Sequence, residues 1–293
     1  MLPIKLTLSG GLGNQLFQFS AGLYLEKILN REVIYDISNL KDNATSEIGN
    51  YTRKMEILEL VTDNYLITSR FPFRWDTPSR LIRRIQNPKT VLIENDSHPQ
   101  ILNAINRETT SVYGYFQDSS LVSEIWPELK AKLEKSSKFA PVVTNQKLDR
   151  ILMHLRFGDY SDDPKTKSVH GLTSPSYFKE AIALQNGNSS LGQDISIVTD
   201  NSQLAINLLN SIDSKLSFQI ISNEEPIADL IEISSSSNVI ISNSTFSWWG
   251  AWFASKLHGS KIIFPRPWFA DLTNPELPLY VPSWIPLDRE YTI

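Results

Sequence analysis

The chain has 293 residues, a formal net charge of -4 at pH 7 and 41% hydrophobic residues, enough for one large core or for two domains. With 20% charged residues, long disordered stretches are excluded, and the acidic balance gives no global basic field that would attract nucleic acid. The absence of cysteine excludes disulfides, thiolate metal sites and a cysteine nucleophile.

The first half of the sequence predicts a βαβ start. Residues 4–8 form an apolar strand that leads into the glycine-rich turn 9–13, and the spacing of apolar residues predicts a helix over 14–29. Further strands are expected at 33–37, 91–93 and 112–116, and an exposed helix near 129–133. Because the start has the pattern of a strand, we predict no signal peptide, and no apolar stretch reaches the length of a membrane span.

In the second half, strands and helices alternate more clearly. Residues 140–145 have the composition of a linker, so we expect an N-terminal Rossmann-like domain over 1–145 and a C-terminal one over 146–293. The expected strands are 151–155, 195–198, 218–221, 239–241 and 262–264, and the expected helices are 177–184, 202–209, 227–233 and 246–257. Strands that alternate with helices predict a parallel sheet with right-handed crossovers.

Two stretches lie outside this alternation. Arg80, Arg83 and Arg84 form a basic cluster on a predicted short helix, which fits either a solvated helix face or a contact surface for a membrane. Since a chain without cysteine fits a reducing compartment, we expect a cytoplasmic protein, with peripheral contact to the cytoplasmic membrane face as the alternative. The tail after Pro265 is too rich in proline for another regular unit and is expected to wrap back over the first half.

The glycine-rich turn between the first strand and helix can bring backbone N–H groups close to a ligand. It does not fit the dinucleotide fingerprint, because the third glycine would fall at Leu16, and no phosphate-loop lysine follows. A structural tight turn and a ligand loop both fit the pattern. The adjacent amides of Asn14 and Gln15 favour a loop that binds sugar hydroxyls, so we predict substrate contacts at Gly11, Gly13, Asn14 and Gln15.

A compact set of chemically active residues, His154-x-Arg156-x-Gly158-Asp159, follows the expected strand at 151–155. Alternation along a strand puts His154 and Arg156 on one face, and the planar guanidinium of Arg156 matches a phosphate group. The structural alternative is an ion pair between Arg156 and Asp159 that ties down a loop. The four histidines of the chain lack metal-ligand spacing, so no metal site is predicted.

Residues 243–247 (Asn-Ser-Thr-Phe-Ser) have the pattern of a helix start, which carries a partial positive charge and free N–H groups and therefore suits an anion. Plain capping would need only one of these hydroxyls. The sequon at Asn243 is expected by chance. Trp248, Trp249 and Trp252 are expected to pack mainly in the core, and Gly259 to end the helix.

Two more polar residues follow expected strands. Asp200 is either the N-cap of the next helix or a hydrogen-bond acceptor for a base or ribose, and Asn223 faces the same choice. In open parallel sheets, ligands bind at the carboxyl ends of the strands, where all of these segments end. Together they suit a ligand with a negatively charged diphosphate.

Three segments in this order resemble the bacterial α-1,2-fucosyltransferases, glycosyltransferase family eleven: residues 10–18, 154–160 and 229–252. The resemblance implies a GT-B architecture, in which two Rossmann-like domains face each other across a cleft. It also implies GDP-L-fucose as donor substrate in the C-terminal domain, no cofactor, and inverting, metal-independent transfer to the 2-hydroxyl of a terminal galactoside. The acceptor would be a galactose-terminated oligosaccharide or glycolipid on the N-terminal side, as in oligosaccharide or O-antigen biosynthesis.

The resemblance also carries residue roles. The arginine that grips the donor diphosphate corresponds to Arg156, and His154 would lie near the guanine. The family usually has two adjacent arginines here, whereas this chain has Phe157 after Arg156. We therefore predict Arg156 and Asp159 as catalytic residues, with Asp159 as general base toward the acceptor hydroxyl. The predicted donor-binding residues are His154, Arg156, Asp200, Asn223, Asn243, Ser244, Thr245, Phe246 and Ser247.

Three other functions remain open at this stage: transfer of another GDP- or UDP-linked sugar on the same fold, a non-catalytic carbohydrate-binding protein, and a magnesium-dependent transferase. The 10% aromatic content supports a binding protein, but the aromatic residues lie in apolar runs. A magnesium site would use Asp162 and Asp163, the adjacent aspartate pair of the chain.

Overall fold

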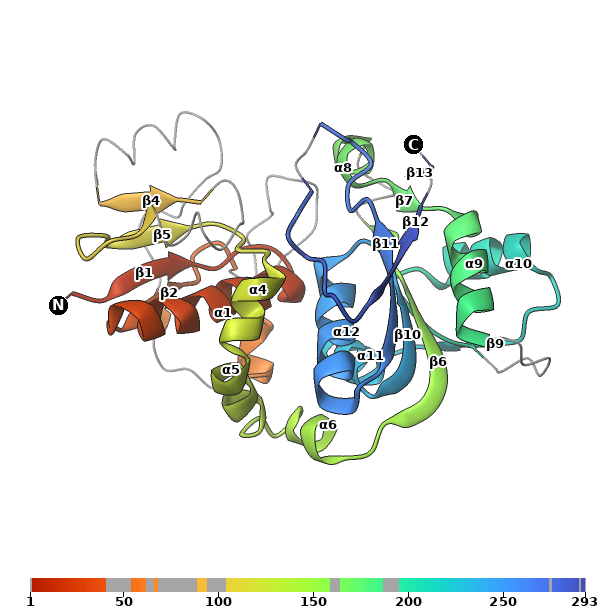
Figure 1. The fold of residues 1–293 in the computed structure, drawn as a ribbon, viewed down its shortest axis with the longest axis horizontal. Helices are drawn as coiled ribbons and strands as arrows, with labels where there is room; N and C mark the ends of the chain where they lie inside the picture. Colours follow the sequence, from red (N-terminus) through yellow and green to blue (C-terminus); the bar gives the residue numbers. More distant parts are fainter. Residues whose placement is uncertain are drawn as a thin grey trace. The chain divides into compact units, whose positions relative to one another are not determined.

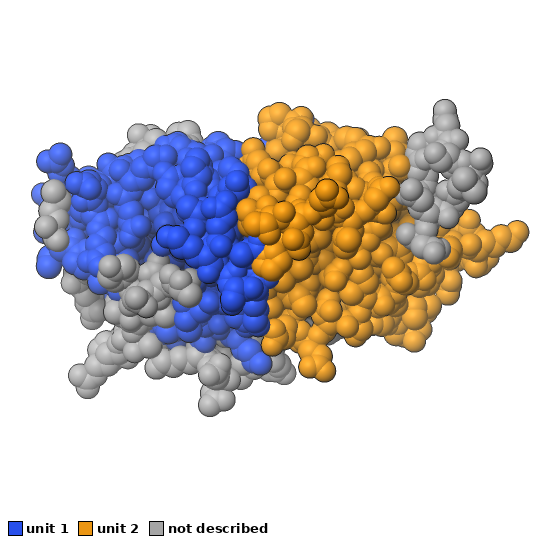
Figure 2. Space-filling model, turned by 90° about the horizontal axis from the view of Figure 1, so that it is seen from below, with its two compact units in different colours: residues 1–140, 277–280 blue, residues 141–276, 281–293 orange. Residues whose placement is uncertain are grey.

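The computed structural model describes residues 2–40, 54–61, 66–67, 89–93, 104–158, 164–186, 195–273, 276–289 and 291–292. The chain forms two compact units, shown in different colours in Figure 2. The N-terminal unit comprises Met1–Ala140 and Leu277–Tyr280, and the C-terminal unit comprises Pro141–Glu276 and Val281–Ile293. Some predicted residues lie outside the described residues: Arg80, Arg83, Arg84, Asp159, Asp162 and Asp163.

The N-terminal unit contains a parallel sheet in the order β3-β2-β1-β5-β4 (Figure 1). Its strands are β1 (Ile4–Thr7), β2 (Val33–Asp36), β3 (Leu66–Ile67), β4 (Thr90–Leu92) and β5 (Ser111–Tyr113). Its helices are α1 (Leu12–Leu29), the 3-10 turn η1 (Ile57–Glu59), α4 (Ser119–Glu124) and α5 (Trp126–Leu133). The βαβ start is confirmed. Strand β1 lies in the middle of the sheet, and its side chains Ile4 and Leu6 are fully buried there.

The C-terminal unit contains a second parallel sheet in the order β12-β11-β10-β6-β8-β9. Its strands are β6 (Leu148–Leu155), β8 (Ile195–Thr199), β9 (Phe218–Ile221), β10 (Ser236–Ile241), β11 (Lys261–Arg266) and β12 (Ile285–Asp288). A short antiparallel pair joins β7 (Leu172–Thr173) and β13 (Tyr291–Thr292). The helices are α8 (Pro164–His170), α9 (Pro175–Asn186), α10 (Ser202–Ile212), α11 (Pro226–Ser234) and α12 (Thr245–His258). The predicted α/β class with parallel sheets is confirmed.

Helices cover both faces of the C-terminal sheet, with α9 and α10 on one face and α11 and α12 on the other (Figure 1). The alternation of β6 sets which side chains meet which helices. Ile151, Met153 and Leu155 belong to the core cluster shared with α9 and α10, whereas His154 contacts α12. The aromatic part of α12 lies in the core as predicted, since Trp248, Trp249 and Trp252 are fully buried.

Two connecting segments are more regular than predicted, although part of the tail returns to the first half as expected, since Leu277–Tyr280 belongs to the N-terminal unit. The expected linker at 140–145 contains the helix α6 (Ala140–Thr144), because Pro141 lies in its first turn, where a proline costs no helical hydrogen bond. The proline-rich tail supplies the strand β12, which pairs with β11 at the edge of the C-terminal sheet. Pro286 is tolerated there because an edge strand leaves one row of backbone groups unpaired.

Candidate active site

The site lies at the carboxyl ends of two neighbouring parallel strands. His154 near the end of β6 pairs in register with Ile241, the last residue of β10, so Arg156 and the turn before α12 emerge at the same edge. The two segments are also joined by side chains, since His154 Nδ1 lies 2.5 Å from Ser247 Oγ in the first turn of α12. Arg156 and Ser242 line one common hollow. The structure therefore brings His154 and Ser247 into contact and places Arg156 and Ser242 along one hollow within the C-terminal unit.

Arg156 is held by Asp200, which follows β8. The guanidinium Nη1 lies 2.6 Å from the Asp200 carboxylate, and both side chains are 25% exposed. The same carboxylate accepts a 2.9 Å hydrogen bond from the Phe157 backbone N–H. Gly158 has φ +26°, and an added Cβ would lie 2.7 Å from Asp200 Oδ2. The loop 156–158 is thus wrapped closely around one carboxylate.

The cap of α10 excludes one of the two roles that the sequence suggested for Asp200. The residue that caps α10 is Asn201, whose side chain accepts a hydrogen bond from the Leu204 N–H, so the N-cap reading of Asp200 was wrong. The sequence reasoning considered an ion pair between Arg156 and Asp159 and missed Asp200 as the partner. A signal was available, because Asp200 directly follows a strand that is adjacent to β6 in the sheet. Phe157, in place of the family's second arginine, is only 6% exposed and packs in the core cluster.

The start of α12 presents its first N–H groups without a side-chain cap. Ser244 is the N-cap residue, and its hydroxyl makes no capping hydrogen bond to the described helix. Trp248 N–H donates to Ser244 O as the first intrahelical bond, which leaves the N–H groups of the preceding turn without a partner inside the helix. Thr245 and Phe246 are partly exposed. This geometry suits an anion better than a capped helix would.

His154 is buried beside these groups as a neutral imidazole. Burial, reinforced by the nearby Arg156 charge, lowers the pKa of His154 from 6.5 to about 3. Its ring also packs against Phe246, with 5.4 Å between ring centroids. Ser247 in turn lies 3.3 Å from Ser242 through the two hydroxyl oxygens. His154 therefore acts as a fixed hydrogen-bonding group and not as a cation near neutral pH.

We expect His154→Gln to flatten the loss of stability at acidic pH. The unfolded chain binds a proton near pH 6.5 and the folded chain only near pH 3, so stability from neutral His154 is complete above pH 6.5 and declines as the pH falls toward 3. Thermal unfolding of both proteins across this pH range measures the difference. An equally steep decline in the variant would contradict the assignment.

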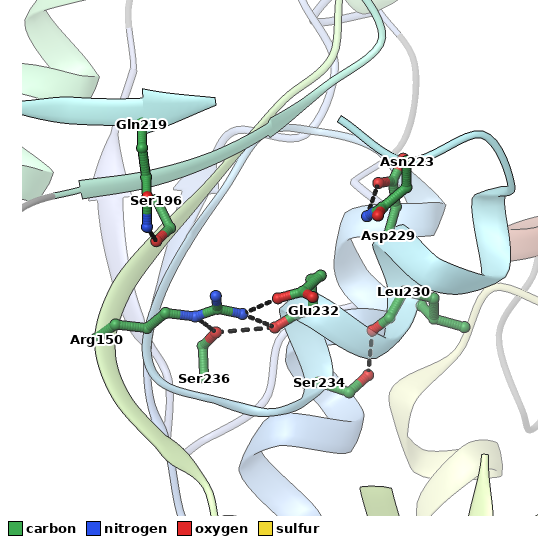
Figure 3. A network of polar contacts seen from close by, with 9 residues as sticks. All are labelled: Arg150, Ser196, Gln219, Asn223, Asp229, Leu230, Glu232, Ser234 and Ser236. Atoms are coloured by element: carbon green, nitrogen blue, oxygen red, sulfur yellow. Dashed lines mark hydrogen bonds and ion pairs between the residues drawn. The ribbon is translucent and has the colours of Figure 1, made fainter. Parts of the chain in front are cut away.

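Two predicted donor-binding amides make internal contacts. Asn243, which is 1% exposed, donates to the carbonyl oxygens of His170 and Trp268 and accepts from the Thr173 hydroxyl. Its burial also keeps the sequon at this position inside the folded unit. Asn223 donates a 2.9 Å hydrogen bond to Asp229, as Figure 3 shows. Burial raises the pKa of Asp229, while this hydrogen bond from Asn223 opposes the rise.

In the N-terminal unit, the predicted substrate residues surround the start of α1. Gly11 is the N-cap, Gly13 is buried in the first turn, and Asn14 is partly exposed. Asn14 Oδ1 accepts a 3.0 Å hydrogen bond from Gln117, a residue that the sequence reasoning missed. The Leu12 N–H donates to the Glu56 carboxylate at 3.2 Å, so a protein carboxylate already contacts this helix start.

Gln15 has a structural role instead of a free amide. It is fully buried, donates to the carbonyls of Gly10 and Lys54 and accepts from the N–H groups of Glu56 and Ile57. These contacts bind the glycine turn to the segment 54–57. The Gln15 amide, which was predicted to contact a substrate, is thus occupied by backbone groups of the protein itself. The side chain of Asn14, in contrast, is partly exposed.

Gln15→Leu is expected to destabilise the protein by roughly 3 kcal/mol, because it leaves several buried backbone groups without their partner. Chemical denaturation measures this loss. Asn14→Leu is the matched control, since its amide makes one described side-chain hydrogen bond and is partly exposed. If both variants lost the same small amount of stability, the structural role of Gln15 would be refuted.

The described residues contain neither a metal-binding cluster nor a membrane-spanning helix. No group of three or more His, Cys, Asp or Glu side chains in that part of the chain is arranged to hold a metal ion. Within the same ranges, no helix is long and apolar enough to cross a membrane.

Comparison with known protein families matches the sequence of this chain to one family. The model of Glycosyl transferase family 11 matches residues 4–287. This chain belongs to glycosyltransferase family 11. The resemblance stated from the three sequence motifs is thereby confirmed.

Two curated relatives from Escherichia coli are similar along nearly the whole chain. One is an O-antigen biosynthesis glycosyltransferase, WbnK, which is 27% identical in an alignment of length 312. This alignment covers 96% of this chain and 99% of the relative. The other is an alpha-1,2-colitosyltransferase, 28% identical over 280 residues that cover 89% and 91%. Among solved structures, the fucosyltransferase NodZ from Bradyrhizobium aligns with a TM-score of 0.49 and 12% identity over 88% of this chain and 94% of that one. The heptosyltransferase WaaC from E. coli aligns with a TM-score of 0.45 and 10% identity over 98% and 93%.

Proposed function

We propose that this family 11 enzyme transfers L-fucose from GDP-L-fucose to the 2-hydroxyl of a terminal galactoside in a glycan. The observation that carries the proposal is the shared edge of β6 and β10, where Arg156 follows one strand and the uncapped start of α12 follows the other, with His154 and Ser247 in contact between them. A guanidinium and a row of helix N–H groups together match the oxygens of a diphosphate.

The chemistry follows from where charge develops. The acceptor oxygen attacks the anomeric carbon while the bond from that carbon to the phosphate oxygen breaks, and negative charge accumulates on the departing GDP. Arg156 and the first turn of α12 stabilise that charge, which lets the transfer proceed without a metal ion. Attack from the face opposite the leaving group inverts the anomeric configuration. The proton of the acceptor hydroxyl passes to a base, for which Asp159 is the candidate in the sequence.

Two supporting residues define the shape of the donor site in this proposal. Asp200 holds the guanidinium group of Arg156 in place through the 2.6 Å ion pair. His154, neutral near pH 7, positions Ser247 at the helix start. We assign the acceptor to the N-terminal unit, where Asn14 and Gln117 form a hydrogen-bonded amide pair beside the glycine turn.

A different donor sugar is the second candidate, because one relative of similar identity is named an alpha-1,2-colitosyltransferase. Arg156 and the start of α12 would contact the diphosphate and therefore do not distinguish between sugars. The O-antigen relative supports an oligosaccharide acceptor in either case.

A donor and acceptor screen tests the proposal. The purified chain is incubated with GDP-L-fucose, nucleotide-linked colitose or UDP-galactose, together with galactose-terminated oligosaccharides, with and without a chelator. Linkage analysis of the product is expected to show fucose on the galactose 2-hydroxyl and no effect of the chelator. Transfer of colitose alone would replace the donor assignment, and turnover that stops in the chelator would refute the metal-independent mechanism. Absence of GDP binding and of all turnover would refute the proposed activity itself.

A further inference from the structure

Arg289 is a buried cation just beyond β12, outside the residues 4–287 that the family model matches. The residue is only 5% exposed. Its Nε donates to Pro267 O at 2.9 Å, and its Nη2 donates to the carbonyl oxygens of His170 and Trp268, each at 2.9 Å. Its Nη1 donates to Thr173 Oγ1 at 3.1 Å. One guanidinium from the tail thus joins β7, the end of α8 and the segment after β11.

The same acceptors connect Arg289 to Asn243. Asn243 Nδ2 donates to His170 O at 2.9 Å and to Trp268 O at 3.2 Å, the two carbonyls that Arg289 also contacts. Thr173 Oγ1 accepts from Arg289 and donates to Asn243 Oδ1 at 3.2 Å. Because a guanidinium only donates, the Thr173 hydroxyl proton is directed to Asn243, and this fixes the orientation of the Asn243 amide.

Asn243 immediately precedes Ser244, the N-cap residue of α12, and its buried side chain anchors the chain at this point. The chain before it is also fastened, since Tyr177 Oη donates to the carbonyl of Ile241 at 2.8 Å. Burial raises the pKa of Tyr177, and the positive charge of Arg289 opposes that rise. The turn from Ile241 to Ser244 is thus contacted by side chains of α9 and β7, and Arg289 reaches it through Thr173.

We propose that Arg289 is a positioning residue for the donor diphosphate. It acts through Thr173 and Asn243 to fix the direction of the first N–H groups of α12, and it does not touch the ligand. Thr173 also lines the small hollow that Arg156 and Ser242 line, so the network lies next to both segments of the proposed donor site. This inference rests on the proposed function, because it assigns to α12 the binding of a diphosphate.

The test measures GDP binding by calorimetry for the wild type and for Arg289→Met, Arg289→Lys and Thr173→Val. We expect Arg289→Met to weaken GDP binding by about tenfold or more, the effect of losing a charge-assisted hydrogen-bond network. Arg289→Lys should recover part of this loss, since an ammonium still donates to carbonyl oxygens. Thr173→Val removes the hydroxyl that joins Arg289 to Asn243 but keeps the hydrogen bonds from Arg289 to three carbonyl oxygens, so it should weaken binding by a smaller factor. In turnover assays, the donor KM should rise while the acceptor KM stays unchanged.

Arg150→Met is the matched control for a purely structural effect. Arg150 lies near the start of β6, at the opposite edge of the same sheet, and donates to Ser236 Oγ and to the carbonyl of Glu232 (Figure 3). It should lower the melting temperature and leave GDP affinity unchanged.

The inference is overturned if Arg289→Met and Thr173→Val both bind GDP like the wild type, or if Arg150→Met weakens binding equally. A wild type that binds no GDP refutes the proposed function first, and the inference falls with it. If Arg289→Met does not fold, Thr173→Val decides the question.

Discussion

Arg156→Ala is expected to lower kcat/KM for the donor by about 100-fold or more, the range observed when one preorganised donor to a developing negative charge is removed. The Asp200 carboxylate, which now pairs with Arg156 at 2.6 Å, would then face the diphosphate without its partner and add repulsion. The double variant Arg156→Ala/Asp200→Asn should therefore regain part of the activity. Steady-state kinetics with varied donor measure both effects.

Arg150→Ala is the control for this variant. Arg150 lies on β6, the strand that Arg156 follows, forms an ion pair with Glu232, and is 18% exposed at its side chain, compared with 25% for Arg156. It should destabilise the protein and keep kcat/KM per folded molecule. An Arg156→Ala enzyme with nearly wild-type kcat/KM would remove the physical basis of the donor site.

Gly158→Ala should disable the donor site with little change elsewhere in the structure. A Cβ at this position would lie 2.7 Å from Asp200 Oδ2 and 3.1 Å from Arg156 Cζ, so the ion pair cannot keep its geometry. The positive φ of +26° adds backbone strain for any residue with a Cβ. We expect GDP affinity to fall by about tenfold or more, since a displaced guanidinium loses a charge-assisted contact to phosphate.

Gly259→Ala separates backbone strain from disruption of the site. Gly259 ends α12 with φ +63°, and a Cβ there would meet no atom within 4 Å. This variant should lose about 1 kcal/mol of stability and keep its affinity for GDP. Equal GDP affinity in both glycine variants would show that the space beside Asp200 is not needed for binding.

The order of elements was predictable because apolar periodicity is a local property. The alternating segments between 151 and 264 predicted the strands and helices of the C-terminal sheet, and Gly259 was correctly placed as the end of α12. The errors fell where composition misleads. A proline inside 140–145 suggested a linker although prolines are accepted in a first helical turn, and a proline-rich tail still supplied an edge strand.

Site residues were predictable by type and less so by role. His154 and Ser247 lie in contact, and Arg156 follows β6 at the same edge, because parallel pairing of β6 and β10 ends both strands there. Asn243 and Gln15 are polar residues in the right motifs, but they satisfy buried backbone groups of neighbouring segments. A motif alone does not distinguish an amide that binds a ligand from one that binds its own chain.

The sequence by itself determined the α/β class, the family and the two segments whose chemistry suits a diphosphate, since each depends on local pattern or on contiguous motifs. Only the tertiary structure decided that Asp200 is the partner of Arg156 and that Arg289 orients Asn243 through Thr173. These pairs join residues from different strands and from the tail. Their contacts follow from how the sheet orders its strands, which no local pattern in the sequence specifies.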